Sequence, residues 1–355
     1  MIKAAFDISG LTGNNITGVG VYTTNLIRAI SETGIVKLSG TYKISRFKNR
    51  KGIFSKLNIP INIPYIPFIY GIIPHDFDVF HGTDFWIPTG GRFKKIITIH
   101  DLAIYHEDMY SEERRNYSVP KFEALFKHSK PDHIIVVSDF IKNEFLNRFP
   151  HFEGRVTTIY HGSEHFSSDT NLKPLFDFPY VAYIGTIEAR KNVLQLFKAF
   201  LIANEKYPDL HLVLAGGTSG YRGEEIMNEI LSHPKADKVR YLGYLDSETA
   251  RRMLSHSQML VYPSLYEGFG FPILEGMKLK IPVVTSSFGA MKEIAGDAAF
   301  TVDTTNTEFI ANAIQDLIAH QDLRQNYISK GIDHAASFSW AKCAKETIDV
   351  YQKVI

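Results

Sequence analysis

The sequence predicts an α/β protein that is built from two doubly wound parallel sheets. Apolar runs of strand type alternate with helical patterns along the chain, and short links join them. About ten runs favour strands, which is more than one open sheet usually holds. The 355 residues suffice for two domains of ordinary size, so two sheets are expected.

The first half of the chain is expected to form the first sheet. Its strand candidates lie at 4–8, 78–81, 96–100, 133–138 and 155–160. Helical patterns begin near Gly20, Ser111 and Ser138. A polar, non-periodic stretch at 162–178 then marks the boundary between the two domains.

The second half repeats the alternation of strands and helices. Its strand candidates lie at 180–184, 210–215, 238–242, 259–262 and 282–285. Helices are expected at 192–207, 224–232, 247–255 and 270–279. After Asp303 the pattern is helical to the end, and Ser339 is suited to cap the last helix.

The composition limits the classes of function. With 45% hydrophobic and 22% charged residues, the chain fits a globular protein with a full core. The net charge of +1 gives no field that favours nucleic acid. The one cysteine, Cys343, excludes a disulfide or a Cys-based zinc site within one chain. The first residues resemble a strand and not a signal peptide, so a cytoplasmic protein is expected.

The segment 43–74 has a composition of its own. Its first part carries six basic residues interleaved with Phe47 and Phe54, and its second part is apolar but contains four prolines. Those prolines forbid a transmembrane helix. Two interpretations remain, a surface loop followed by buried extended chain or a peripheral patch on the anionic inner face of a membrane.

The stretch from Glu267 to Glu275 is the most informative part of the sequence. A buried strand at 258–264 precedes it, so the order is strand, glycine turn and helix start, with Glu275 about one turn inside the helix. In open α/β sheets this is where ligands bind and where backbone N–H groups hold phosphates. Carboxylates repel phosphates but accept hydrogen bonds from hydroxyls. A ligand with both groups, a sugar nucleotide, is therefore indicated.

A smaller glycine motif follows the first strand. Gly18 and Gly20 open a helix, but Thr23 stands where a dinucleotide-binding fingerprint has its third glycine. Either the glycines form a tight turn, or they let backbone N–H groups approach an anion at the helix N-terminus.

Two adjacent cations follow the first strand of the second half. Gly185 ends that strand, and Arg190 and Lys191 are expected in the first turn of the next helix. The helix dipole disfavours cations at this end, so the pair indicates a bound polyanion. A solvated basic pair is the alternative.

His100 and Asp101 directly follow the strand at 95–99. Asp84 is a further acid that we expect beside them. Strand ends collect catalytic groups in such sheets, although a buried histidine can also be an ordinary core residue. No helical His pair and no acidic triplet has the spacing of a metal site. Neither a metal nor a cofactor is therefore expected.

Together these motifs resemble glycosyltransferase family 4, a group of retaining enzymes with the GT-B fold, along nearly the whole chain. The segments 267–275 and 185–192 match best, and Gly18, Gly20, His100-Asp101 and the Phe338-Ser-Trp340 start of a crossover helix add support. The resemblance implies two Rossmann-like domains that face a cleft. It implies an acceptor-binding domain at 1–165, a donor-binding domain at 166–336 and a helix at 337–355 that crosses back to the first domain.

The resemblance also implies roles for single residues. Arg190 and Lys191 would clamp the donor's diphosphate, Glu275 would bind the ribose and Glu267 would face the donor sugar. His100, next to Asp101, would contact that sugar near the reacting carbon. Backbone N–H groups would contact sugar and phosphate at Gly18, Gly20, Gly268, Phe269, Gly270 and Phe271.

One position departs from the family pattern. Many members carry Arg where this chain has Thr186, which leaves the division of work between Arg190 and Lys191 open. The implied mechanism needs no enzymic nucleophile, because the leaving diphosphate takes the acceptor's proton. Glu267 is therefore not interpreted as half of a glycosidase pair.

The substrates are indicated only in part. The segments 98–102 and 185–188 resemble the mannosyltransferase branch, so GDP-mannose is the first donor candidate, with UDP-glucose, UDP-galactose and UDP-N-acetylglucosamine as alternatives. The expected acceptor is a glycan or a lipid-linked sugar of cell-surface polysaccharide synthesis, such as lipopolysaccharide. A non-catalytic sugar-nucleotide-binding protein is the alternative to an enzyme. The loops expected to select the acceptor, 43–74 and 105–120, contain no pattern that identifies it.

Overall fold

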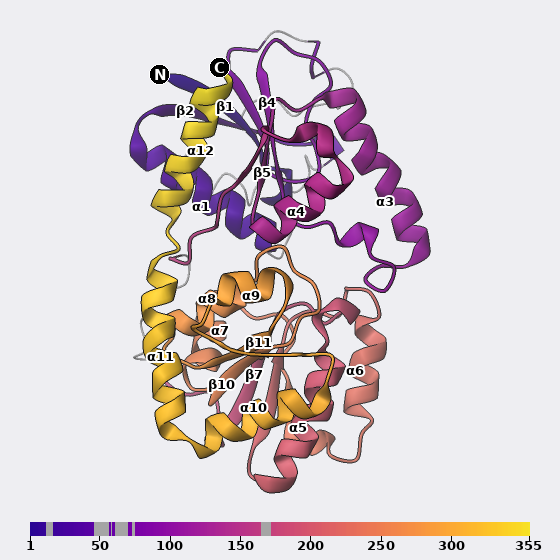
Figure 1. Cartoon of the computed structure of the whole chain (residues 1–355), viewed down its shortest axis with the longest axis vertical. Helices are drawn as coiled ribbons and strands as arrows, with labels where there is room; N and C mark the ends of the chain where they lie inside the picture. Colours follow the sequence, from indigo (N-terminus) through magenta and orange to yellow (C-terminus); the bar gives the residue numbers. More distant parts are fainter. Residues whose placement is uncertain (12–16, 46–56, 58, 61–69, 73–74, 165–171) are drawn as a thin grey trace. The chain divides into compact units, whose positions relative to one another are not determined.

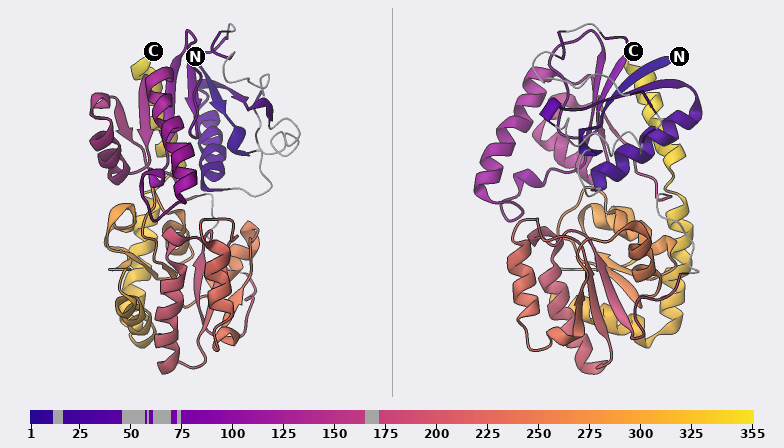
Figure 2. Two further views of the ribbon diagram at one scale, coloured as in Figure 1. Left: turned by 90° about the vertical axis from the view of Figure 1, so that its right-hand side faces the viewer. Right: turned by 180° about the vertical axis from the view of Figure 1, so that it is seen from behind.

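The computed structural model describes residues 1–11, 17–45, 57, 59–60, 70–72, 75–164 and 172–355. The chain divides into two compact units. Unit 1 comprises Met1–Tyr105, Glu112–His165 and Ser339–Ile355, and unit 2 comprises His106–Ser111 and Phe166–Phe338. Each unit contains one parallel sheet with helices on both faces (Figures 1 and 2).

The sheet of unit 1 has the strand order β2-β1-β3-β4-β5-β6 among the described residues. Its strands are β1 (Ile2–Asp7), β2 (Val36–Thr41), β3 (Val79–Gly82), β4 (Lys94–Ile99), β5 (His133–Val136) and β6 (Val156–Thr158). Its central strands are buried and mostly apolar, as a sheet covered by helices requires, with His81 and Thr98 as buried polar residues. The direction of winding changes between β1 and β3, which lie side by side.

Four α-helices cover this sheet within the described residues. They are α1 (Gly18–Thr33), α3 (Glu112–Ala124), α4 (Asp139–Arg148) and α12 (Trp340–Val354). A π-helical turn (Leu125–Ser129) extends α3. The last helix of the chain, α12, packs against α1, as Figure 1 shows. Ser339 caps α12 as predicted, because its side chain accepts a hydrogen bond from the N–H of Lys342.

The sheet of unit 2 has the strand order β12-β11-β10-β7-β8-β9. Its strands are β7 (Tyr180–Ile184), β8 (His211–Ala215), β9 (Val239–Tyr241), β10 (Met259–Tyr262), β11 (Val283–Ser286) and β12 (Phe300–Val302). Its helices are α5 (Val193–Lys206), α6 (Gly223–Leu231), α7 (Ser247–Ser255), α8 (Phe271–Lys278), α9 (Gly289–Ala295), α10 (Thr307–Ala319) and α11 (Gln321–Ala336).

The two doubly wound parallel sheets confirm the predicted fold class, and all ten predicted strands are present within a few residues. The prediction missed β2 and β12, which lie at the edges of their sheets. The sequence of β2, VKLSGT, is half polar, and β12 has only three residues, so neither gives a strong apolar signal. It also missed the seven-residue helix α9.

The unit boundaries fall after residues 165 and 338, and the short segment His106–Ser111 joins unit 2. The predicted boundaries were 165 and 336. Most of the basic and proline-rich segment 43–74 lies outside the described residues, as does 165–171 of the expected linker. Among the helices that the structure describes, none is long and apolar enough to span a membrane.

Candidate active site

The motifs of unit 2 meet where the winding of its sheet changes direction. β7 and β10 are neighbours in the sheet but are joined through β8 and β9 in the chain. The loop after β7 carries Arg190 and Lys191, and the loop after β10 carries Glu267. Ligands of open α/β sheets bind at such a point, beyond the carboxyl ends of the strands.

Arg190 and Lys191 lie ahead of helix α5. The prediction that they occupy its first turn is wrong, because they belong to a separate 3-10 turn, Ala189–Lys191. Asn192 follows with a left-handed backbone (φ 59°), which interrupts the helix, and its side chain donates to the carbonyl of Thr304 at 2.8 Å. The side chains of Arg190 and Lys191 therefore extend from a tight turn and not from a helix.

Glu267 collects four side-chain partners, three of them at Oε1. This oxygen accepts hydrogen bonds from the hydroxyls of Tyr262 (2.6 Å) and Ser264 (3.1 Å), and from the ammonium group of Lys191. Its Oε2 accepts from Nη1 of Arg190 at 2.9 Å. Glu267 is only 8% exposed, and these donors compensate for the cost of burying its charge.

Arg190 bridges two carboxylates. Its Nη1 also donates to the carbonyl of Tyr266 at 3.0 Å, while Nη2 forms an ion pair with Glu188 at 2.8 Å. Lys191 in turn donates to the hydroxyl of Tyr262 at 2.8 Å. The cluster thus holds two cations and two carboxylates, with no net charge of its own.

Glu188 and Tyr262 are members of this cluster that the sequence did not reveal. Glu188 lies in the segment 185–192, and Tyr262 lies in the predicted strand at 258–264. Glu188 is buried, and burial raises the pKa of Tyr262, so its hydroxyl keeps its proton. A glutamate two residues before an arginine was the signal available in the sequence.

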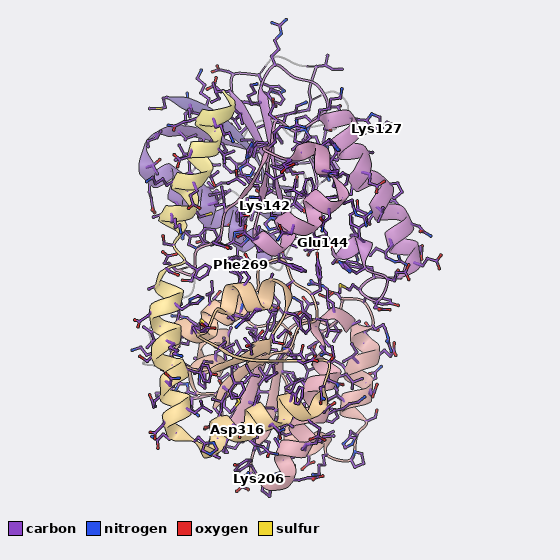
Figure 3. The ribbon with its side chains drawn as sticks, in the orientation of Figure 1. Lys127, Lys142, Glu144, Lys206, Phe269 and Asp316 are labelled. Carbon is purple, nitrogen blue, oxygen red and sulfur yellow. The ribbon has the colours of Figure 1, made fainter. Side chains whose placement is uncertain are left out.

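The turn after Glu267 leads directly into helix α8. Gly270 has a φ of 93°, which only glycine adopts without strain, and a Cβ there would lie 2.5 Å from Cε of Met291. The helix begins at Phe271, so the N–H groups of the turn from Gly268 to Phe271 lie at a helix N-terminus. Phe269, which is labelled in Figure 3, lies in this turn and is buried. Glu275 lies one turn into α8, as predicted, and is half-buried.

The second group of predicted residues lies in unit 1, again where the sheet changes direction. The loops after β1 and β3 meet, because the hydroxyl of Thr83 donates to the carbonyl of Asp7 at 2.6 Å. Gly18 and Gly20 form the first turn of α1, whose N-cap Thr17 accepts from the N–H of Gly20. Burial raises the pKa of Asp7 to about 6.

His100 follows β4 and is held by the loop after β3. Its Nε2 lies 2.9 Å from the carbonyl oxygen of Thr83, so that nitrogen carries the proton. Burial lowers the pKa of His100, against the opposing effect of Asp84 and Asp101. The ring stays neutral at neutral pH, with Nδ1 as a hydrogen-bond acceptor. Asp101 itself accepts from the N–H of Ala103 at 3.2 Å.

The structure therefore brings the predicted residues together in two groups. Arg190, Lys191 and Glu267 touch directly, and the turn 268–271 and Glu275 continue from them in unit 2. The predicted residues of unit 1 are Gly18, Gly20, His100 and Asp101. Over the part of the chain that is described, no group of three or more His, Cys, Asp or Glu side chains is arranged to hold a metal ion.

Two parallel doubly wound sheets, each with polar groups at its switch point, form the GT-B fold. Residues 171–334 match the model for group 1 glycosyl transferases, and residues 16–164 match the model for glycosyltransferase family 4. The chain belongs to glycosyltransferase family 4 and is a hexosyltransferase.

Relatives of known function support this assignment. The chain is 29% identical over 289 residues to O-antigen chain mannosyltransferase B of Escherichia coli, a match that covers 77% of this chain and 74% of the relative. It is 26% identical over 284 residues to alpha-maltose-1-phosphate synthase of Mycolicibacterium smegmatis, which covers 73% of each.

Solved structures share the fold over the whole chain. Sucrose-phosphate synthase from Thermosynechococcus elongatus superposes with a TM-score of 0.76 at 19% identity, covering 100% of this chain and 99% of that one. Anabaena HepE in complex with UDP-glucose gives a TM-score of 0.76 at 15% identity, covering 99% and 100%.

Proposed function

We propose that the protein transfers mannose from GDP-mannose to a glycan or lipid-linked acceptor in cell-surface polysaccharide synthesis, with retention of the anomeric configuration. The observation that carries the proposal is the cluster of Arg190, Lys191 and Glu267 at the switch point of unit 2. It places two cations next to a helix N-terminus, which suits a diphosphate. The carboxylates Glu267 and Glu275 suit the hydroxyls of a sugar and a ribose.

The contacts of the two cations favour different roles. The guanidinium of Arg190 bridges Glu188 and Glu267 and is fixed between them. Arg190 therefore holds Glu267 and the turn that follows it in place. Lys191 contacts Glu267 and the phenol of Tyr262, and its ammonium group is a compact charge that suits a phosphate oxygen. Lys191 is therefore the principal ligand of the diphosphate, and Arg190 supports it.

This division also accounts for Thr186. A diphosphate develops extra negative charge as the bond to the sugar breaks, and cations stabilise that charge. With Thr186 in place of an arginine, the charge comes from the turn 189–191. No side chain is then required as a nucleophile, because the leaving phosphate accepts the acceptor's proton.

The unit 1 residues belong to the same proposal and lie at the switch point of their own sheet. The neutral ring of His100 presents Nδ1 as an acceptor for a hydroxyl of the donor sugar, since Nε2 is held by Thr83. The first turn of α1, with Gly18 and Gly20, offers backbone N–H groups to the diphosphate. Asp101 shapes the loop after β4 through its hydrogen bond to Ala103.

The identity of the donor rests on the relatives. The O-antigen mannosyltransferase supports mannose, whereas the Anabaena structure contains UDP-glucose and shares only the fold. A UDP-sugar-dependent transferase is therefore the second candidate. A sugar-nucleotide-binding protein without activity is the third, and the complete charged cluster argues against it.

The direct test is turnover with a panel of donors. Purified protein is incubated with GDP-mannose, UDP-glucose, UDP-galactose or UDP-N-acetylglucosamine, with and without a lipid extract as acceptor. The proposal expects release of GDP from GDP-mannose and an α-linked product by NMR. Release of UDP alone would move the proposal to the second candidate, and no release from any donor would favour the third.

Two further features belong to the proposal. We expect activity without a metal or cofactor, so that EDTA leaves the rate of transfer unchanged. We also expect the protein to act in the cytoplasm, with the basic segment 43–74 in contact with anionic lipid. Cosedimentation with vesicles that contain phosphatidylglycerol tests this contact, and equal binding to neutral vesicles contradicts it.

A further inference from the structure

A chain of buried hydrogen bonds links the last helix of unit 1 to its first helix. The hydroxyl of Tyr351 on α12 lies 2.7 Å from Nδ1 of His81 on β3. Nε2 of His81 lies 2.8 Å from Oγ1 of Thr98 on β4, which lies 2.8 Å from the hydroxyl of Tyr22 on α1. None of these four side chains is more than 1% exposed.

The imidazole in the middle of this chain is neutral. Burial lowers the pKa of His81 to about 3. A neutral imidazole has one donor and one acceptor nitrogen, and the hydroxyls of Tyr351 and Thr98 engage both. Loss of either hydroxyl would leave a buried ring nitrogen without its partner, which is costly.

Close packing of this region does not require a chain of buried hydrogen bonds. Apolar side chains of similar shape would fill the same space without the cost of burying polar groups. A fully satisfied polar network, by contrast, fixes one arrangement of its members. This chain of hydrogen bonds therefore fixes the position of the Tyr22 ring.

The ring of Tyr22 is the surface against which two histidines rest. Its centroid lies 4.9 Å from that of His100, in an edge-on arrangement, and 4.7 Å from that of His161. Trp340, the first residue of α12, stacks on His161 at 5.9 Å and lies 6.3 Å from Tyr22. The close approach requires Gly162, where a Cβ would lie 2.3 Å from the backbone nitrogen of Trp340.

We propose that α12 is a working part of the site in unit 1, with Tyr351 and Trp340 as positioning residues for His100. Tyr351 acts through His81, Thr98 and Tyr22, and Trp340 acts through the rings of His161 and Tyr22. This inference rests on the proposed role of His100 toward the donor sugar. Truncating or altering the end of the chain would then disturb transfer without removing any group that touches substrate.

The test removes single hydroxyls and compares them with a matched control. Tyr351→Phe and Thr98→Val each remove one hydroxyl from this chain of hydrogen bonds. Tyr180→Phe is the control, because Tyr180 is equally buried, lies in unit 2 and donates one hydrogen bond to the carbonyl of Met253 at 2.6 Å. All three lose a buried hydrogen bond and some thermal stability.

Only the variants in unit 1 are expected to lose kcat. A displacement of His100 lowers kcat about tenfold, while KM for the donor stays within about twofold. The double variant Tyr351→Phe, Thr98→Val loses little more than either single variant, because both break the same chain. Equal kcat in Tyr351→Phe and Tyr180→Phe overturns the proposal.

A second readout does not depend on turnover. The imidazole ¹⁵N resonances of His81 and His100 are recorded in the wild type, Tyr351→Phe and Tyr180→Phe. The proposal expects the resonances of both histidines to shift in Tyr351→Phe alone. An unchanged His100 resonance overturns it. If no donor is turned over by the wild type, the proposed function fails, whereas the resonances still decide whether Tyr351 positions His100.

Discussion

Arg190 and Glu267 lie 77 residues apart in the sequence and meet at 2.9 Å in unit 2. Their ion pair joins the loop after β7 to the loop after β10, at the point where the sheet changes its direction of winding. Lys191 and Tyr262 close on the other oxygen of the same carboxylate. The proposed donor site is thus formed by the fold itself.

Replacing Lys191 with Ala should abolish donor turnover while leaving the protein folded. Glu267 keeps Arg190, Tyr262 and Ser264 as donors, so the cluster loses one of four partners. Loss of an electrostatic contact to the leaving group should lower kcat at least about a hundredfold. The matched control is Lys292→Ala, which removes an exposed pair with Asp297 and should keep full activity. Near-normal turnover in Lys191→Ala would refute its role.

Arg190→Lys should be damaging although it keeps the charge. An ammonium group cannot reproduce the planar contacts of Arg190 to Glu188, Glu267 and the carbonyl of Tyr266. We expect a loss of stability of about 1–3 kcal/mol and a kcat lowered about tenfold or more. Urea unfolding and initial rates measure both.

The control for this substitution is Arg222→Lys. Arg222 pairs with Glu225 on the surface, where both side chains are more than half exposed, so little should change. If Arg190→Lys behaves like Arg222→Lys, the bridge between Glu188 and Glu267 has no function.

These contacts show how far the sequence could predict the site. The apolar runs of β7 and β10 are strong signals, so the positions of both loops followed from the sequence. That β7 and β10 are neighbours, and that Arg190 therefore meets Glu267, depends on the order of strands in the sheet. Local patterns carry no information about that order.

The same limit applies in unit 1. His100 was identified because it follows a strand, but nothing near it in the sequence points to Tyr351. That residue reaches His81 across 270 positions, through a helix that packs on unit 1. The strands β2 and β12 escaped prediction for a different reason, since β2 is half polar and β12 has only three residues.

Gly270→Ala should destabilise the turn for two separable reasons. The left-handed backbone at φ 93° strains any L-residue, and the new Cβ meets Cε of Met291 at 2.5 Å. We expect a loss of about 1–3 kcal/mol and a raised KM for the donor. The double variant Gly270→Ala, Met291→Ala should regain only the stability that is lost to contact between the new Cβ and Met291.

The backbone part has its own control. Gly154 has a φ of 79°, and nothing lies within 4 Å of an added Cβ, so Gly154→Ala measures conformational strain alone. Thermal unfolding of Gly270→Ala, Gly154→Ala, Met291→Ala and the double variant gives both parts. An equal loss in Gly270→Ala and Gly154→Ala would show that contact with Met291 does not matter.

The stability of the fold should fall in mild acid. Burial lowers the pKa of His81 to about 3 and that of His133 to about 4, from an ordinary value near 6.5. Below pH 6.5 the unfolded chain binds these protons and the folded chain does not, so each group lowers the free energy of unfolding by up to about 1.4 kcal/mol per pH unit. This contribution is present above pH 6.5 and is lost as the pH falls toward the folded pKa values.

Asp7 has the opposite sign. Its pKa is raised to about 6 from 3.8, so the folded chain binds this proton first and gains stability as the pH falls through that window. Asp7→Asn removes the opposing contribution and should make the loss between pH 6 and 4 steeper. Urea unfolding at several pH values checks this, and a shallower loss in the variant would contradict it.

Calorimetric titration of nucleoside diphosphates tests the central claim most directly. GDP and UDP are titrated into the wild type, Lys191→Ala and Lys292→Ala. The account predicts that GDP binds the wild type and Lys292→Ala equally, and that Lys191→Ala binds it at least about tenfold more weakly, since a hydrogen-bonded charge contributes about 1.5–3 kcal/mol. Equal affinity of the wild type and Lys191→Ala for GDP and UDP, or no binding by the wild type, would contradict it.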